Sequence, residues 1–110
     1  MKLPEEGILL RIFISETDRV HGKALYEQIV LKARELGLAG ATVIRGTMGF
    51  GASSRVHTSK ILRLSEDLPV VIELVDTEEN LNKLMPFIDE NATEGLVTME
   101  KVRVIKYRHK

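Results

Sequence analysis

The sequence predicts an α+β fold in which a four-stranded antiparallel sheet carries two helices on one face. The 110-residue chain has the length of one domain, and a 44% share of hydrophobic residues is enough to form a core. The absence of cysteine excludes disulfides and Cys-based metal sites. The hydrophobic pattern also follows the order strand, helix, strand twice, so the two halves of the chain share one plan.

The first half of the chain predicts a strand, a helix and a second strand. Residues 7–15 form an apolar stretch with β-branched residues and with Arg11 in the middle, which predicts a strand. The geometry of a strand places alternate side chains on the buried face of the sheet. This buried set is Leu10, Ile12 and Ile14. Thr17 and Asp18 can cap a helix over residues 20–36, which has an apolar stripe and a glycine after its end. Residues 41–47 predict the second strand.

The second half repeats this plan. Residues 70–75 predict a strand, and Asp76 and Thr77 can cap the helix that follows. Pro86 lies inside the apolar stripe of that helix and predicts a kink or an early break, because proline removes one amide donor. Residues 96–107 predict the last strand.

Two tandem strand–helix–strand units with right-handed crossovers give a ferredoxin-like βαββαβ sandwich, here one domain over residues 1–110. Both helices pack on one face, so no helix remains to cover the other. Strand alternation assigns to the uncovered face Leu9, Arg11, Phe13, Val43, Arg45, Val71, Glu73 and Val75, together with Lys101 and Arg103. This mixture of apolar and charged residues favours an interface between copies, and an open face with scattered apolar residues is the alternative.

The charge pattern excludes several classes of protein. Sixteen basic and sixteen acidic residues give a formal net charge of zero, which argues against a nucleic-acid binder. No apolar run is long enough to cross a membrane, and the first residues lack the apolar core of a signal peptide, so we expect a cytoplasmic location. The stretch between Glu35 and Glu66 has no acidic residue, which predicts a basic pocket unless folding mixes it with acidic segments.

Segment 46–60, between the two halves, has the composition of an anion-binding loop. Its glycines let the backbone approach a ligand, and its hydroxyl and cationic side chains can donate hydrogen bonds to an anion. The candidate ligand-binding residues are Gly46, Gly49, Gly51, Ser53, Ser54, Arg55, His57, Thr58 and Lys60. Their spacing matches neither a P-loop nor a dinucleotide motif, and a mobile hairpin is the alternative. The three histidines lack metal-ligand spacing and no nucleophile–base pair is evident, so we expect no metal, no cofactor and no enzyme.

Two stretches of the sequence carry a resemblance to a known family. They read GATVIRGxxGFG over residues 40–51 and SRxHTxKILRLSxDLPVVIE over residues 54–73. Ile14, Ser15, Glu16 and Asp18, followed by Leu25 and Tyr26, add to the match. The chain resembles an uncharacterised bacterial and archaeal family of PII-like proteins, which is similar to PII signal transducers and CutA-like trimers.

The resemblance implies a homotrimer that binds a small anionic, nucleotide-like effector in the clefts between subunits. Segment 46–60 would be the effector-responsive loop, and Lys101 and Arg103 would contact phosphate across the cleft. The turn at residues 91–95 departs from the family pattern, because it is acidic where PII proteins have a glycine- and lysine-rich turn that holds phosphates. The predicted function is therefore a non-enzymatic regulator with an unknown protein partner. The alternatives are a small phosphate-handling enzyme that uses His57 and a structural oligomer without a ligand.

Overall fold

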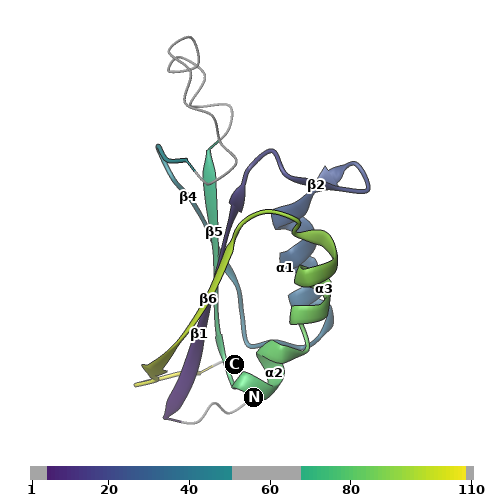
Figure 1. The fold of residues 1–110 in the computed structure, drawn as a ribbon. Helices are drawn as coiled ribbons and strands as arrows, with labels where there is room; N and C mark the ends of the chain where they lie inside the picture. The colour runs from purple at the N-terminus through teal and green to yellow at the C-terminus, as the bar shows by residue number, and fades with distance from the viewer. Residues whose placement is uncertain (1–4, 51–67, 109–110) are drawn as a thin grey trace.

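Four strands form an antiparallel sheet, and the helices lie together on one of its faces (Figure 1). The structure is a computed structural model that describes residues 5–50 and 68–108. The strands of the sheet are β1 Glu6–Ser15, β4 Thr42–Arg45, β5 Pro69–Asp76 and β6 Leu96–Arg103. The helices are α1 Leu25–Glu35, α2 Glu78–Asn82 and α3 Met85–Asn91. The strand order β4-β5-β1-β6 is that of a ferredoxin-like sandwich, so the predicted fold class is confirmed.

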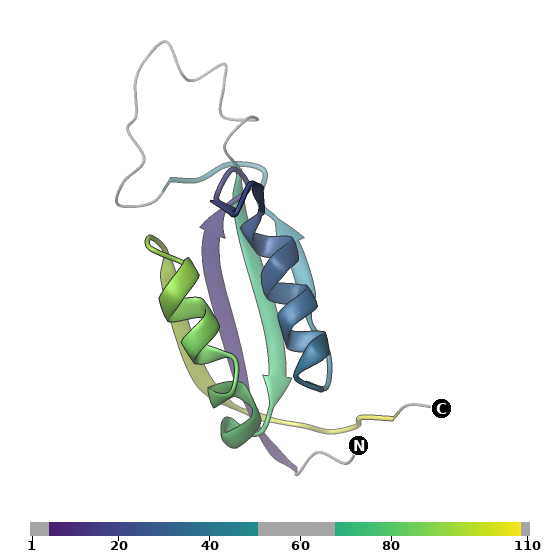
Figure 2. The same cartoon turned by 90° about the vertical axis from the view of Figure 1, so that its right-hand side faces the viewer.

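The core lies between the sheet and the helices, which cover its inner face side by side (Figure 2). Every second residue is buried from Leu10 to Ile14 in β1 and along the whole of β5, which confirms the predicted face of β1. The buried strand residues are Leu10, Ile12, Ile14, Val70, Ile72 and Leu74. The helices bury Leu25, Ile29, Ala33, Leu81, Leu84 and Ile88 against them. The apolar stripes therefore decide which face of the sheet is covered.

The first helix starts later than predicted, because a short hairpin precedes it. Strands β2 Arg19–Val20 and β3 Lys23–Ala24 pair across a two-residue turn in which His21 has φ 50° and Gly22 has φ 78°. Two positive φ values in succession are typical of a tight hairpin turn and are incompatible with a helix. The predicted cap by Thr17 and Asp18 is wrong, since the carboxylate of Asp18 instead accepts from the backbone N–H of Ser15 at 3.0 Å.

The second helical segment is broken as predicted. The hydroxyl of Thr77 accepts from the backbone N–H of Asn80 at 3.1 Å and so caps α2. Pro86 lies in the first turn of α3, where its missing N–H has no helical partner to lose. The last strand is shorter than predicted, because β6 ends at Arg103 and residues 104–107 leave the sheet as a tail.

Gly95 allows the turn before β6 to pass close to β1. Its φ is +132°, and a Cβ at this position would lie 2.5 Å from the carbonyl oxygen of Phe13. We expect Gly95→Ala to lower the free energy of unfolding by about 2 kcal/mol or more, because both the backbone conformation and the contact disfavour a side chain. Urea denaturation measures this loss. Gly40→Ala is the control, since a Cβ there meets nothing within 4 Å, and an equal effect of the two substitutions would contradict the explanation.

Candidate functional site

The face of the sheet opposite the helices, called the open face below, is uncovered by any described helix. Residues directly opposite each other in neighbouring strands share a face, so the strand register defines its members. Leu9 pairs with Val75, Arg11 with Glu73 and Phe13 with Val71. The open face thus consists of Leu9, Arg11, Phe13, Val71, Glu73, Val75, Thr42, Ile44, Leu96, Thr98, Glu100 and Val102. The predicted assignments on β1 and β5 are confirmed.

The predicted assignments on β4 are wrong. Val43 pairs with Ile72 and Arg45 with Val70, both of which are buried on the helix side of β5. The hydrogen bond from Gly46 N to the carbonyl oxygen of Pro69, at 2.8 Å, continues this register. A shift of one residue moves every side chain of a strand to the other face, so Thr42 and Ile44 occupy the open face instead.

The same correction applies to β6. Lys101 pairs with Ile8 and Arg103 with Glu6, so the register places both basic residues on the helix side of the sheet. Arg103 also forms an ion pair with Glu5, with 3.2 Å between Nη2 and Oε1. The predicted role of these two residues as phosphate contacts stays a prediction.

Arg11 holds two carboxylates at the centre of the open face. Its Nε lies 2.8 Å from Glu73 Oε2, and its Nη1 lies 2.9 Å from Glu100 Oε1. The hydrogen bond to Glu73, together with the negative charges of both glutamates, raises the pKa of Arg11 above its usual value although desolvation opposes this. These three residues, called the Arg11 cluster below, join the three adjacent strands β5, β1 and β6.

The rest of the open face is largely apolar. Leu9, Phe13, Val71 and Val75 are half-buried, and Ile44 and Leu96 are 46% and 56% exposed. Isolated apolar residues are common on protein surfaces, but here they surround a single ion-paired cluster on one continuous sheet face. This arrangement has the character of a protein–protein interface, with apolar contacts around a few paired charges.

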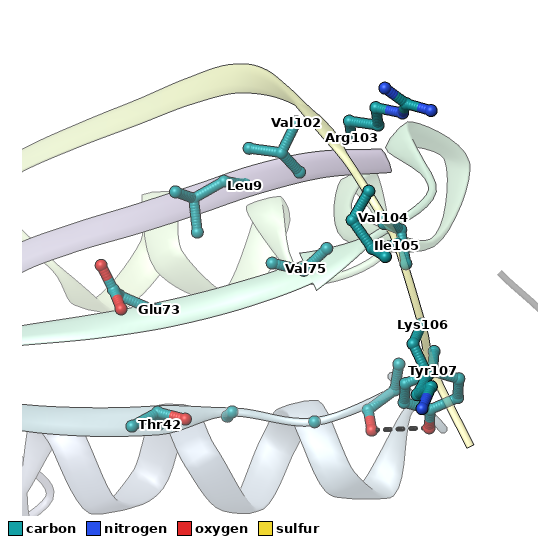
Figure 3. Close-up of a pocket in the computed structure, with 13 residues that line it drawn as sticks. Leu9, Thr42, Glu73, Val75, Val102, Arg103, Val104, Ile105, Lys106 and Tyr107 are labelled. Carbon is teal, nitrogen blue, oxygen red and sulfur yellow. Dashed lines mark hydrogen bonds between the residues drawn. The ribbon is translucent and has the colours of Figure 1, made fainter. Parts of the chain in front are cut away.

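A groove of about 620 Å³ lies on this face, beside Thr42 at the start of β4 and Val75 near the end of β5 (Figure 3). Leu9, Val75 and Val102 line it from the strands, while Figure 3 shows the tail at residues 104–107 crossing beside them. Glu73 of the Arg11 cluster also lines the groove, which connects it with the open face. The groove offers a mainly apolar surface next to the cluster.

Hydrogen bonds attach the tail to the body of the protein. Val104 N donates to the carbonyl oxygen of Glu5, and the hydroxyl of Tyr107 donates to the carbonyl oxygen of Ala39 at 3.0 Å, the dashed line in Figure 3. Ala39 N in turn donates to the carboxylate of Asp76 at 2.8 Å. The tail and the start of β4 are therefore both linked to the end of β5.

Asp76 is a fully buried carboxylate whose importance was not evident from the sequence. Its Oδ1 accepts from the backbone N–H of Thr77 at 2.7 Å and from the side-chain amide of Asn80 at 2.9 Å, while Oδ2 accepts from Ala39. The sequence indicated a helix cap at this position, which Thr77 provides. Only the fold brings Ala39 next to Asp76, so no local pattern could have revealed the third bond.

The described part of the predicted anion-binding loop is its base. Gly46 and Gly49 both pack on Pro69, since a Cβ on either glycine would lie within 3.0 Å of the proline ring. Arg45 is paired with Glu16, with 2.8 Å between Nη2 and Oε1. The arginine that directly precedes this loop is therefore already paired with a carboxylate. The other candidate residues lie outside the described part of the chain: Gly51, Ser53, Ser54, Arg55, His57, Thr58 and Lys60.

The described residues contain neither a cluster of metal ligands nor a membrane-spanning helix. No group of three or more His, Asp or Glu side chains in residues 5–50 and 68–108 could hold a metal ion. Among the helices in these same ranges, none has the length and apolar character needed to span a bilayer.

Similar solved structures identify the class of fold. A protein from Thermus thermophilus described as a PII-like signaling protein aligns with a TM-score of 0.62 and 18% identity, over 91% of this chain and 90% of that chain. CPII from Thiomonas intermedia, solved with ADP and bicarbonate bound, aligns with a TM-score of 0.58 and 19% identity, over 92% and 90%. The fold is therefore PII-like.

Sequence comparisons identify the family. Residues 7–104 match the family DUF190, described as "Uncharacterized ACR, COG1993", and the chain belongs to this family. A UPF0166 protein from Aquifex aeolicus is 40% identical over 97 residues, which cover 88% of this chain and 91% of the relative. The UPF0166 protein MJ1524 from Methanocaldococcus jannaschii is 37% identical over 99 residues, which cover 89% and 91%. The resemblance predicted from the sequence is confirmed.

Proposed function

We propose that this protein is a PII-like regulator without catalytic activity. Three copies assemble through their open faces, and a small anionic, nucleotide-like effector binds in the clefts between them. Effector binding changes segment 46–60, which then acts on a partner protein. The observation that carries this proposal is the open face, because its apolar residues and paired charges are left uncovered by the described helices.

The composition of the open face supports assembly over exposure to solvent. Half-buried Leu9, Phe13 and Val71 would lose their remaining contact with water when copies meet, which favours association. The charged atoms of Arg11 and Glu73 already satisfy each other within one chain, so they do not have to find a new partner across the interface. Closed rotational symmetry is the usual outcome when identical subunits associate.

The loop composition supports an anionic effector. Arg55, His57 and Lys60 are cationic donors within a segment that has no acidic residue to neutralise them. The hydrogen bond from Gly46 N to the carbonyl oxygen of Pro69 holds the start of this segment next to the first residue of β5. The structural neighbour from Thiomonas intermedia carries ADP, and a nucleotide is the effector class we propose for this chain.

A thermal-shift screen of nucleotides and phosphorylated metabolites tests the effector. A ligand present at 100 times its dissociation constant should stabilise the folded protein by about 2.7 kcal/mol. We expect Arg55→Ala to reduce the shift, since it removes a bidentate donor to phosphate. Arg34→Ala, on the exposed side of α1, is the control that should keep the full shift. The absence of a shift with every ligand, or an equal loss in both variants, would contradict the proposal.

A further inference from the structure

We propose that the β6 edge of the open face in one copy meets the β4 edge of the open face in the next copy, so that each copy completes the groove of its neighbour. This inference rests on the proposed function, because it requires the open faces to form the interface between copies. It deepens that proposal, since it assigns a partner to each edge of the sheet and places the groove at the boundary between two copies.

The open face is built of transverse rows, each with one residue from every strand. The strand register defines two complete rows, because residues opposite each other lie side by side on one face. The first row is apolar and runs from β4 to β6 through Ile44, Val71, Phe13 and Leu96. The second row is polar and runs through Thr42, Glu73, Arg11 and Thr98. The two edges of the open face therefore carry the same kind of residue at each level.

The apolar row has its most exposed residues at its two ends. Ile44 and Leu96 are exposed, whereas Val71 and Phe13 between them are half-buried. Removal of apolar surface from water favours association roughly in proportion to its area. Contact between the Leu96 end of one copy and the Ile44 end of the next would cover the exposed part of the row and continue the row from copy to copy.

A carboxylate lies at the β6 edge, one level beyond the polar row. Glu100 pairs with Leu9 in the register, and its side chain is 58% exposed. One of its oxygens accepts from Arg11 at 2.9 Å, while Arg11 also holds Glu73. Glu100 therefore shares its cation with a second carboxylate, and it has the capacity to accept from a further donor.

A lysine lies at the β4 edge of the same region. The tail crosses from the end of β6 to the segment before β4, where Tyr107 donates to the carbonyl oxygen of Ala39 (Figure 3). Lys106 precedes Tyr107, is exposed and lines the groove together with Leu9, the residue in line with Glu100.

The charges of the two edges are complementary. Glu73 and Arg103, which also line the groove, are paired within the chain with Arg11 and Glu5. The ammonium group of Lys106 is thus the charge of the groove that is left for a partner. Edge-to-edge contact brings it next to Glu100 of the neighbouring copy, and charge complementarity of this kind fixes how two surfaces align.

The difference between the two edges favours a closed ring over a pair with two-fold symmetry. An isologous contact sets the same patch of both copies against itself, whereas a heterologous contact joins two different patches and closes into a ring. An isologous contact would use one edge and leave the other in water. A ring uses both edges of every copy and sets β6 of each copy beside residues 39–42 of the next, which line the groove.

Cysteine cross-linking tests the inference, because the chain has no cysteine of its own. The double variant Ile44→Cys/Leu96→Cys is treated with a short bis-maleimide and analysed by denaturing electrophoresis. The two positions lie on opposite edges of the four-stranded sheet, about 14 Å apart within one chain, so a shorter reagent joins only different chains. We expect a covalent product of three chains from the double variant, a product of two chains when the single variants are mixed, and none from either single variant alone.

The matched control is Val43→Cys/Val97→Cys. These residues adjoin Ile44 and Leu96 in the sequence and have similar exposure, but the register places them on the helix side of the same edge strands. Thiols that assembly holds together react at a high effective concentration, so we expect at least about tenfold more product from Ile44→Cys/Leu96→Cys than from this control. If the double variant does not assemble, Thr42→Cys/Thr98→Cys tests the same contact one row along.

The outcomes separate this inference from the proposed function. An assembly in which neither open-face pair cross-links, or in which the control pair cross-links equally well, would overturn the inference and leave assembly intact. Efficient cross-linking of Leu96→Cys alone would indicate an isologous contact and would also overturn it. A wild-type protein that remains a single chain in light scattering would overturn both proposals. Circular dichroism of each variant confirms that the fold is retained.

Discussion

Asp76→Ala is expected to lower the free energy of unfolding by about 4 kcal/mol, since three donors lose a charged acceptor inside the protein. These donors are Ala39 N, Thr77 N and the side-chain amide of Asn80. Ala39 lies before β4, Thr77 caps α2 and Asn80 lies within α2. One carboxylate at the end of β5 therefore joins these segments. Loss of the Asp76 carboxylate leaves these N–H groups without a partner. Buried donors without partners cause some of the largest losses of unfolding free energy that single substitutions produce.

Urea denaturation of Asp76→Ala beside Asp89→Ala measures this effect. Asp89 is exposed on α3, and its substitution should change stability by no more than about 0.5 kcal/mol. Asp76→Asn should give an intermediate loss, because an amide keeps one acceptor oxygen and places an N–H group near a donor. Equal stability of Asp76→Ala and Asp89→Ala would show that the buried network does not hold the fold together.

Val71→Lys is expected to separate the assembly into single chains. Val71 lies on the open face opposite Phe13, beside the Arg11 cluster. In a single chain the lysine stem can lie along the sheet while its amine reaches water, so the fold should be retained. In an assembly the amine would be buried without a partner, and the association constant should fall by about 1000-fold or more.

Light scattering of Val71→Lys and Leu31→Lys compares the two sides of the molecule. Leu31 is an exposed apolar residue of α1, on the helix side, and its substitution introduces the same charge there. We expect Leu31→Lys to keep the wild-type mass. If Val71→Lys also remained assembled, the interface would have to lie elsewhere on the molecule.

The sequence predicted the inner part of the sheet well because β1 and β5 lie between other strands. From Leu10 onwards in β1 and along all of β5, the helix-side residues are deeply buried, so buried and half-buried residues alternate clearly there. β4 and β6 are edge strands, and nearly all of their residues are exposed. Val43 and Ile44 are adjacent and both apolar, so the pattern of β4 does not indicate which one faces the helices. Pairing with β5 decides this.

A local hairpin and a contact between distant residues account for two other differences. The His21–Gly22 turn was not expected because the helix was predicted to begin at Val20, whereas Val20 belongs to the hairpin and packs against the core. Gly46 and Gly49 were assigned to ligand binding from composition, whereas the structure gives them a packing role against Pro69. The packing of these two glycines on Pro69 does not follow from local spacing, since the pairing of β4 with β5 brings the two segments together.

The mass of the wild-type protein in solution at micromolar concentration tests the central claim most directly. Three copies joined through their open faces should scatter as a particle of about 37 kDa, three times the chain mass of 12.4 kDa. A particle of 12.4 kDa would show that the uncovered sheet face is exposed to water, and would contradict both the assembly and the shared effector clefts.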